Sequence, residues 1–239
     1  MKKVLFFIGA RAGSKGLKNK NIKFLNGKPL IYWSVKQALK SKFCKDLIIS
    51  SDSQKILNLC SKLSKKIFPI KRPKNLSSHN SGKFLAWKHA LIKYEEIKKT
   101  KIDYVLDLDC TNPMRHVDDI NNIIKKKIRF KKIDAIVTIA NSRKNPYFNM
   151  IEKNKKNFLK ISKTLRAWPV RRQDAPEVYD QVASIYCLNR KFILKKNNIY
   201  QGKIYGYKVK NYQIYDIDSK LDFEIIEYLF KRYKRKLLK

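Results

Sequence analysis

The chain has 239 residues, of which 44% are hydrophobic, and it carries a formal net charge of +37. This length and apolar content suit one large α/β domain with a complete core, and they exclude a disordered chain. The cationic excess is mainly lysine spread along the whole sequence, with runs such as 125–127 between apolar residues. This spread predicts solvated helix faces and an attraction for anionic substrates, and it argues against a nucleic-acid footprint.

No targeting or anchoring segment is expected. The apolar run that follows Met1 is too short for a signal peptide, and no stretch approaches the roughly 18 apolar residues of a membrane span. The four cysteines lie far apart and form no C-x-x-C pair, which predicts reduced structural thiols and neither a zinc site nor a disulfide framework. We therefore expect a soluble, cytoplasmic protein that binds no membrane and no nucleic acid.

The segment from Val4 to Asn21 begins with an apolar run typical of a strand buried on both faces. A loop of small residues follows, which lets backbone N–H groups approach a ligand closely, and Arg11, Lys15 and Lys20 add positive charge. The spacing is neither that of a Walker A loop nor G-x-G-x-x-G. We interpret the loop as a polyphosphate site, with a Gly-rich turn bearing surface lysines as the alternative.

Strands and helices then alternate, which is the pattern of a mostly parallel sheet with right-handed crossovers. Ligands of such sheets bind beyond the carboxyl ends of the strands, where both the small-residue loop and Ser51-Asp52-Ser53 are expected. The triplet is equally suited to cap the helix that follows it. The expected helices span about 28–41, 54–65, 82–97 and 223–233, and the expected strands span about 46–50, 67–70, 104–109 and 134–140.

Two pairs of alternating carboxylates are candidates for the site. Asp107 and Asp109 share one face of a buried strand, and a charge there is costly unless it is paired or used, so Asp109 is a good site candidate and Asp107 a weaker one. Asp216 and Asp218 flank an apolar residue, so an expected strand points both carboxylates one way. Such a pair suits Mg²⁺, which prefers oxygen ligands, better than it suits a merely acidic turn. Asp222 is expected to cap the last helix.

The loop sequence R-x-G-S-K-G-x-x-x-K-N resembles the signature of the CMP-sugar synthetases, the acylneuraminate cytidylyltransferases that activate nine-carbon acidic sugars. R-P-x-x-L from Arg72, L-D-C-T-N-P-M-R at 108–115, R-K-N-P-Y-F-N at 143–149 and R-R-Q-D-A-P at 171–176 resemble further family motifs in the same order. The second and third are most similar to the branch for N,N'-diacetyllegionaminic acid. Three positions depart from the family: Asp109 replaces a glutamine, Val182 an asparagine, and His79-Asn80 stand where an aspartate is usual. We interpret His79 as a surface loop histidine in preference to a catalytic base.

The resemblance implies a three-layer, Rossmann-like nucleotidyltransferase fold of class α/β, in one domain over 1–239. It further implies an excursion at about 146–186 that forms a homodimer. The implied reaction transfers CMP from CTP to a nonulosonic acid, with legionaminic acid favoured, and requires Mg²⁺. The alternatives are an N-acetylneuraminate, pseudaminate or 8-amino-octulosonate synthetase and, more remotely, a basic nucleic-acid-binding module, which has no need of paired metal carboxylates.

The resemblance also implies roles for individual residues. Arginine suits a sugar carboxylate because its planar fork binds both oxygens. The implied nucleotide-binding residues are Arg11, Gly13, Ser14, Lys15, Gly16, Lys20, Asn21 and Arg72. Arg11, Lys20 and Asp218 are the implied catalytic residues, Asp109, Tyr147, Arg172 and Gln173 the sugar-binding residues, and Asp216 and Asp218 the metal ligands.

Overall fold

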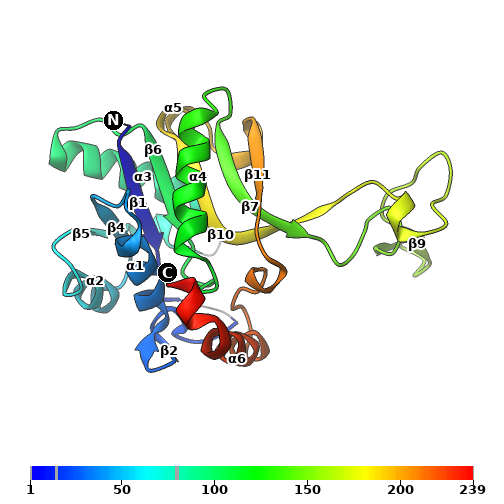
Figure 1. Ribbon diagram of the computed structural model, residues 1–239, viewed down its shortest axis with the longest axis horizontal. Coiled ribbons are helices and arrows are strands. Elements are labelled where there is room, and N and C mark those ends of the chain that lie inside the picture. Colours follow the sequence, from blue (N-terminus) through cyan, green and yellow to red (C-terminus); the bar gives the residue numbers. More distant parts are fainter. Residues whose placement is uncertain (1, 14–15, 79–80, 239) are drawn as a thin grey trace.

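In the computed structural model, which describes residues 2–13, 16–78 and 81–238, a seven-stranded sheet has the order β11-β7-β10-β6-β1-β4-β5 (Figure 1). The sheet is mostly parallel, as predicted, with β10 antiparallel to both of its neighbours. The strands are β1 (Val4–Gly9), β4 (Leu47–Ser51), β5 (Ile67–Lys71), β6 (Tyr104–Leu108), β7 (Ala135–Asn141), β10 (Tyr179–Asn189) and β11 (Ile204–Lys208).

Helices cover both faces of the sheet. Successive side chains of β1 point to opposite faces, and because they are apolar, each face needs a layer of helices to bury it. Phe6 and Ile8 pack with residues of α1, α2 and α4, whereas Leu5 and Phe7 pack with residues of α3 and α5. Figure 1 shows α4 crossing the front of the sheet. The three-layer α/β expectation is therefore confirmed. The helices are α1 (Leu30–Lys40), α2 (Gln54–Ser61), α3 (Lys83–Lys98), α4 (Val117–Arg129), α5 (Arg190–Lys195) and α6 (Lys220–Leu237).

Helix boundaries differ from the sequence expectation most in α2 and α6. Ser53 caps α2 as predicted, but the helix ends at Ser61 because the chain must turn to pair Ile67 with Leu47. The final helix begins earlier than expected, with Ser219 as its N-cap. Asp222 lies in the first turn and accepts from the Ser219 backbone N–H at 2.7 Å, which completes a capping box.

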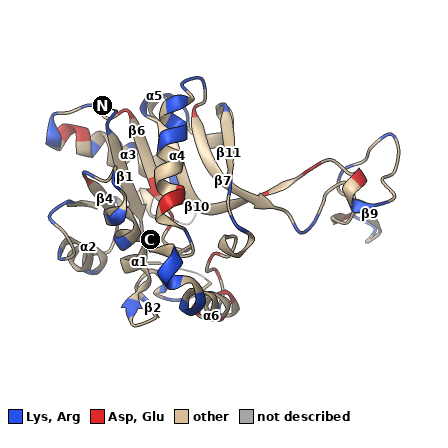
Figure 2. Cartoon of the chain, viewed as in Figure 1, with Lys and Arg blue, Asp and Glu red and all other residues tan. Residues whose placement is uncertain are grey.

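The charge is spread over many helices and loops, as Figure 2 shows. The lysine run in α4 was expected to be solvated, and this is wrong for Lys127, which is only 1% exposed. Its Nζ donates to the Ile133 carbonyl at 2.8 Å and lies 4.9 Å from the centre of the Tyr104 ring. The long aliphatic stem is thus buried while the ammonium finds polar and aromatic partners. No helix in the described ranges is both long and apolar enough to cross a bilayer.

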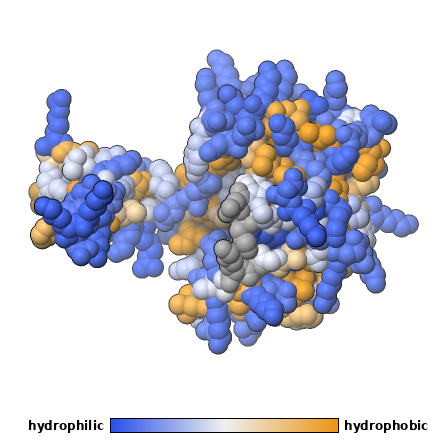
Figure 3. All heavy atoms as spheres, turned by 180° about the vertical axis from the view of Figure 1, so that it is seen from behind, coloured by the Kyte–Doolittle hydropathy of each residue, from blue (hydrophilic) through white to orange (hydrophobic). Residues whose placement is uncertain are grey.

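An arm, residues 142–178, leaves the sheet after β7 and returns as β10 (Figure 1). Its tip holds a small antiparallel hairpin of β8 (Ile151–Lys153) and β9 (Leu159–Ile161). Apolar side chains on the arm lie open to solvent (Figure 3), among them Val170 at 84% exposed and Phe158 at 68%. An isolated two-stranded hairpin is marginally stable in water, and burial of these apolar side chains would stabilise it.

The excursion that the sequence placed at about 146–186 therefore has different limits. Its expected last residues, from Tyr179 onward, form β10 inside the sheet. The reason is pairing on both sides: Ile185 and Tyr186 lie beside β6, and Tyr179 and Gln181 lie beside β7. The alternation of strands and helices stops in this region because the arm is followed directly by an antiparallel strand. The alternation alone does not predict where that strand lies in the sheet.

Candidate active site

A pocket of about 310 Å³ opens at the carboxyl ends of β1, β5 and β6, where ligands of such sheets bind. Four cationic side chains line it: Arg11, Lys20, Arg72 and Lys83. Asp109 is the acidic residue that lines it among those described. A concave site with this concentration of positive charge suits a polyanionic ligand.

The small-residue loop is held to the wall of this pocket by its own polar side chains. The Asn21 amide donates to the Arg11 carbonyl at 2.9 Å, and the Arg11 guanidinium donates to the Ser78 carbonyl at 3.2 Å. Gly13 is exposed, and a methyl group added there would meet no atom within 4 Å. Ser14, Lys15 and His79 lie outside the described residues, so their predicted roles remain predictions.

Lys20 joins the loop to the C-terminal acidic motif. Its ammonium lies 2.8 Å from Asp218 Oδ1 and donates to the Ile217 carbonyl. Lys20 is 9% exposed and lines the pocket, whereas the Asp218 side chain is 77% exposed. The structure thus brings together two motifs that are almost two hundred residues apart in the chain.

The acidic motif forms an irregular segment and not the strand that was expected. Its backbone meets the end of β6 where the Ile217 N–H donates to the Thr111 carbonyl at 3.0 Å, without a ladder among the described residues. Ile217 is fully buried beside Leu25 and Trp33, as its apolar character predicts. The buried Ile217 anchors the segment, with Asp216 half-buried on one side of it and Asp218 exposed on the other.

These two carboxylates fit a divalent cation. Burial, and then the nearby charges of Asp218 and Asp109, raise the pKa of Asp216, so a cation between the carboxylates would relieve their repulsion. No group of three or more His, Cys, Asp or Glu side chains suited to a metal occurs in the described ranges. A pair suffices for Mg²⁺, which usually takes its other ligands from phosphate and water.

Gly16 packs directly against the acidic motif. A methyl group at this position would lie 2.0 Å from the Asp218 carbonyl oxygen, a distance that no real contact allows. We expect Gly16→Ala to separate the small-residue loop from Asp218 and to lower turnover of CTP at least about 100-fold, because misplaced groups lose most of their catalytic effect. The measurement is pyrophosphate release at saturating CTP.

Gly82→Ala is the matched control for this prediction, since the space beside Gly82 is open, its φ of −64° suits any residue, and it does not line the pocket. It should retain turnover within about threefold of wild type. Equal turnover in both variants would show that the contact between Gly16 and Asp218 has no part in catalysis.

Arg72 is buried at the pocket floor, where its Nε donates to Ser50 Oγ at 3.1 Å and its Nη2 to the Ser50 carbonyl at 2.9 Å. Burial lowers the pKa of this guanidinium, against the opposing effect of Asp52. A methyl group on Gly9 would lie 2.8 Å from Arg72 Nη2, so Gly9 provides the space that the guanidinium occupies. The predicted nucleotide-binding Arg72 therefore faces the pocket from a fixed position.

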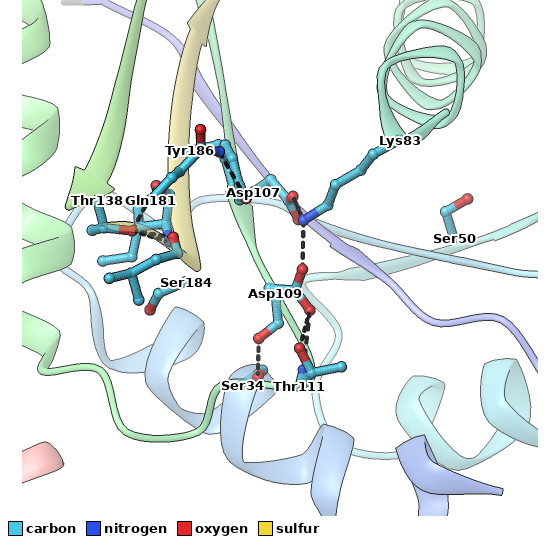
Figure 4. Close-up of polar contacts among 12 residues, drawn as sticks. Ser34, Ser50, Lys83, Asp107, Asp109, Thr111, Thr138, Gln181, Ser184 and Tyr186 are labelled. Carbon is cyan, nitrogen blue, oxygen red and sulfur yellow. Dashed lines mark hydrogen bonds and ion pairs between the residues drawn. The ribbon is translucent and has the colours of Figure 1, made fainter. Parts of the chain in front are cut away.

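Asp109 is held from both sides (Figure 4). Its Oδ1 accepts from the Thr111 N–H at 3.0 Å and from the Thr111 hydroxyl at 2.9 Å, while its Oδ2 lies 2.7 Å from Lys83 Nζ. Burial acts to raise the pKa of Asp109, but Lys83 and the Thr111 bonds outweigh it and lower the pKa to about 2. The weaker candidate, Asp107, is fully buried and does not line the pocket.

Arg115 is a fully buried guanidinium with neutral partners, and sequence reasoning assigned it no role. It donates to Ser184 Oγ at 3.3 Å, Ser34 Oγ at 2.9 Å, Gln37 Oε1 at 3.2 Å and the Asp109 carbonyl. Burial lowers its pKa to about 10. It thus ties α1, β10 and the end of β6 together beneath Asp109.

We expect Arg115→Met to lower the free energy of unfolding by about 3 kcal/mol, because it leaves several buried polar groups without a partner. Urea denaturation of both proteins measures the loss. Arg129→Met, on the exposed side of α4, is the control and should change stability by less than about 0.5 kcal/mol. An unchanged midpoint for Arg115→Met would mean that relief from burying the charge balances the lost bonds.

The other predicted sugar-binding residues lie elsewhere. Arg172 and Gln173 line a second cavity of about 370 Å³ on the arm, and no described residue lines both cavities. The Arg172 guanidinium donates to the Ser142 carbonyl. Tyr147 is also on the arm, half-buried. Within one chain the arm extends away from the sheet, so these residues do not line the pocket with Asp109, and their role in sugar binding stays a prediction.

Val182, where the family resemblance expects an asparagine, is 2% exposed and packs with Ala140 and Val209. It lines neither cavity. An apolar residue at this position is therefore explained by burial in the small cluster beside β7, without a contact to the candidate site.

The family model for cytidylyltransferases matches residues 5–238. The chain therefore belongs to the cytidylyltransferase family and is a nucleotidyltransferase. It is 36% identical over 232 residues to post-translational flagellin modification protein B of Campylobacter coli, covering 97% of this chain and 96% of that protein. It is also 36% identical over 230 residues to CMP-N,N'-diacetyllegionaminic acid synthase of Campylobacter jejuni, covering 96% and 95% of the two chains.

The fold is similar to that of a CMP:2-keto-3-deoxy-manno-octonic acid synthetase solved in complex with CTP. The TM-score is 0.67 at 15% sequence identity, over 97% of this chain and 99% of that chain. This likeness supports the predicted Rossmann-like nucleotidyltransferase fold.

Proposed function

We propose that the protein transfers CMP from CTP to a nonulosonic acid of the legionaminic acid type and releases pyrophosphate. The observation that carries the proposal is the contact between the two motifs: Lys20, which lines the cationic pocket, ion-pairs with the exposed Asp218 of the acidic motif. Such a site suits a triphosphate. The favoured sugar rests on the 36% identity to the legionaminic acid synthase.

The chain's own residues would act mainly by placing the reactants and neutralising charge. Arg11, Lys20 and Arg72 would hold the phosphates and stabilise the charge that develops on the leaving pyrophosphate. The attacking group is the anomeric hydroxyl of the sugar, whose oxygen forms a bond to the α-phosphorus as the bond to pyrophosphate breaks. Asp216 and Asp218 would hold Mg²⁺, which supplies charge neutralisation on the phosphate oxygens.

We infer that the arm completes the site of a second copy. Arg172 and Gln173 are displaced from the nucleotide pocket of their own chain, and the arm exposes apolar side chains that a partner would cover. A two-fold dimer in which each arm crosses to the other subunit accounts for both observations. The sugar would then bind between Asp109 of one subunit and the arm of the other.

We propose that the reaction takes place in the cytoplasm, where CTP is available. We also propose that the whole chain, with the arm, forms one cytidylyltransferase domain. A basic nucleic-acid-binding module is disfavoured because the cations of the site surround a concave pocket. Such a module would bind RNA with a steep dependence on salt.

The test is pyrophosphate release with CTP and Mg²⁺, using N,N'-diacetyllegionaminic, N-acetylneuraminic and pseudaminic acids and an eight-carbon amino sugar acid. The highest ratio of kcat to KM is expected for the legionaminic acid. A higher ratio for another sugar would move the assignment to that sugar while leaving the reaction in place. Absence of CTP binding to the folded protein would overturn the reaction itself.

A further inference from the structure

Lys83, which the sequence motifs do not single out, connects two carboxylates at the edge of the nucleotide pocket. It is the first residue of α3, and its Nζ lies 2.6 Å from Asp107 Oδ2 and 2.7 Å from Asp109 Oδ2 (Figure 4). The same ammonium lies 4.4 Å from the centre of the Tyr186 ring. Three elements of the fold therefore converge on one cation.

The position of Lys83 in its helix is unfavourable without these partners. The N-terminus of a helix carries a partial positive charge, so a lysine in the first turn is destabilising unless a negative charge compensates it. Asp107 and Asp109 provide that compensation. Burial lowers the pKa of Lys83, but the two carboxylates outweigh it and raise the pKa, so the ammonium stays charged.

Asp107 depends on Lys83 in turn. Its side chain is fully buried in β6, where burial raises the pKa of the carboxyl group and the ammonium of Lys83, 2.6 Å from Oδ2, opposes that rise. Lys83 is the one described cation within ion-pair distance of Asp107. A buried carboxylate without a cation is strongly destabilising, so the three charges form a unit.

The unit borders the pocket with the ligand-binding cations. Lys83 and Asp109 line the same cavity as Arg11, Lys20 and Arg72. Without the ammonium, two carboxylates close together would oppose the attraction that those three cations exert on a polyanion. Asp109 would also lose the partner of its Oδ2, leaving it fixed by Thr111 alone among the described residues.

We propose that Lys83 is a positioning residue of the nucleotide pocket, which neutralises the pair Asp107 and Asp109, fixes the Asp109 carboxylate and so keeps the pocket attractive to the triphosphate of CTP. The inference rests on the proposed binding of CTP in this pocket. Lys83 would thus increase the affinity for CTP through Asp109, without touching the reacting atoms.

A double-mutant cycle tests the proposal, with the dissociation constant of CTP measured by calorimetry on the full-length protein. Lys83→Met should weaken CTP binding about 30-fold, with kcat at saturating CTP within about threefold of wild type. In a background of Asp107→Asn, which removes one carboxylate, the same change should weaken binding only about threefold, since less negative charge is left uncompensated.

Lys93→Met is the matched control, because Lys93 lies on the same helix in an exposed ion pair with Glu96. It should bind CTP as wild type does. If Lys83→Met does not fold, Lys83→Gln, which also removes the charge, takes its place in the same cycle with the same expected losses. Equal affinities of wild type and the Lys83 variant would overturn the proposal, as would the same loss in both backgrounds.

CTP binding and sugar turnover are measured separately, so a wrong sugar assignment can be told apart from a wrong role for Lys83. If the wild-type protein binds CTP but turns over no sugar, the sugar assignment fails while the cycle still decides the role of Lys83. If the folded wild-type protein binds no CTP, the reaction and the inference fall together.

Discussion

Asp218→Ala is expected to reduce pyrophosphate release at least about 1,000-fold, because it removes one of two carboxylates that would hold the cation on the triphosphate. The same change takes away the ion-pair partner of Lys20, whose ammonium would then keep only its bond to the Ile217 carbonyl among the described residues. Release is measured with CTP, Mg²⁺ and the preferred sugar under single-turnover conditions.

The protein should remain folded in this variant, since the Asp218 side chain is largely exposed. Asp118→Ala is the control, because Asp118 is an exposed residue in the first turn of α4, outside the pocket lining. It should retain wild-type turnover. Turnover within tenfold of wild type in Asp218→Ala would remove the acidic motif from the mechanism.

Arg172→Ala is expected to lower kcat/KM for the sugar about 100-fold or more, because a planar guanidinium pairs with both oxygens of a carboxylate. If the arm acts on the partner's site, the loss is recoverable in a mixed dimer. A heterodimer with Asp218→Ala in one subunit and Arg172→Ala in the other has one site that holds both wild-type residues, so about half of the wild-type turnover should return. Co-expression with two affinity tags isolates this species.

Arg171→Ala serves as the control, since Arg171 is exposed, pairs with Asp174 at 3.0 Å and does not line the arm cavity. Its effect on kcat/KM should stay below about threefold. A heterodimer as inactive as its two parent homodimers would show that Arg172 serves the subunit that carries it.

Much of the sheet was predictable because strands buried on both faces give continuous apolar runs. Val4 to Ile8 and Leu47 to Ile49 are such runs, and both form interior parallel strands of the sheet. β10 lacked this signal at its start, where Tyr179, Asp180 and Gln181 are exposed before the chain enters the core. Its antiparallel place between β6 and β7 depends on distant partners, which a local pattern does not contain.

The site was partly predictable for the same kind of reason. Small residues followed by cations, and carboxylates that alternate with a buried isoleucine, are local patterns, and the structure brings Lys20 and Asp218 together as they suggest. Lys83 and Arg115 were given no role. Lys83 is an ordinary helix lysine, and Arg115 ends the motif at 108–115 without a chemistry of its own, so only the packing of α1, α3, β6 and β10 gives them their partners.

The placement of β10 has a consequence for how the chain folds during synthesis. β6 and β7 are completed first, but β10, which separates them, emerges from the ribosome only after the whole arm. Until then each of these strands presents an unpaired edge, the feature through which partly folded chains associate wrongly. Pairing between such distant segments is also slow, since the entropy of closing a long loop is lost before the strand contacts stabilise the pair. The nascent chain therefore passes through a stage in which β7 is still separate from the paired strands β5, β4, β1 and β6, until β10 joins β7 to β6 and β11, the last strand, adds to β7.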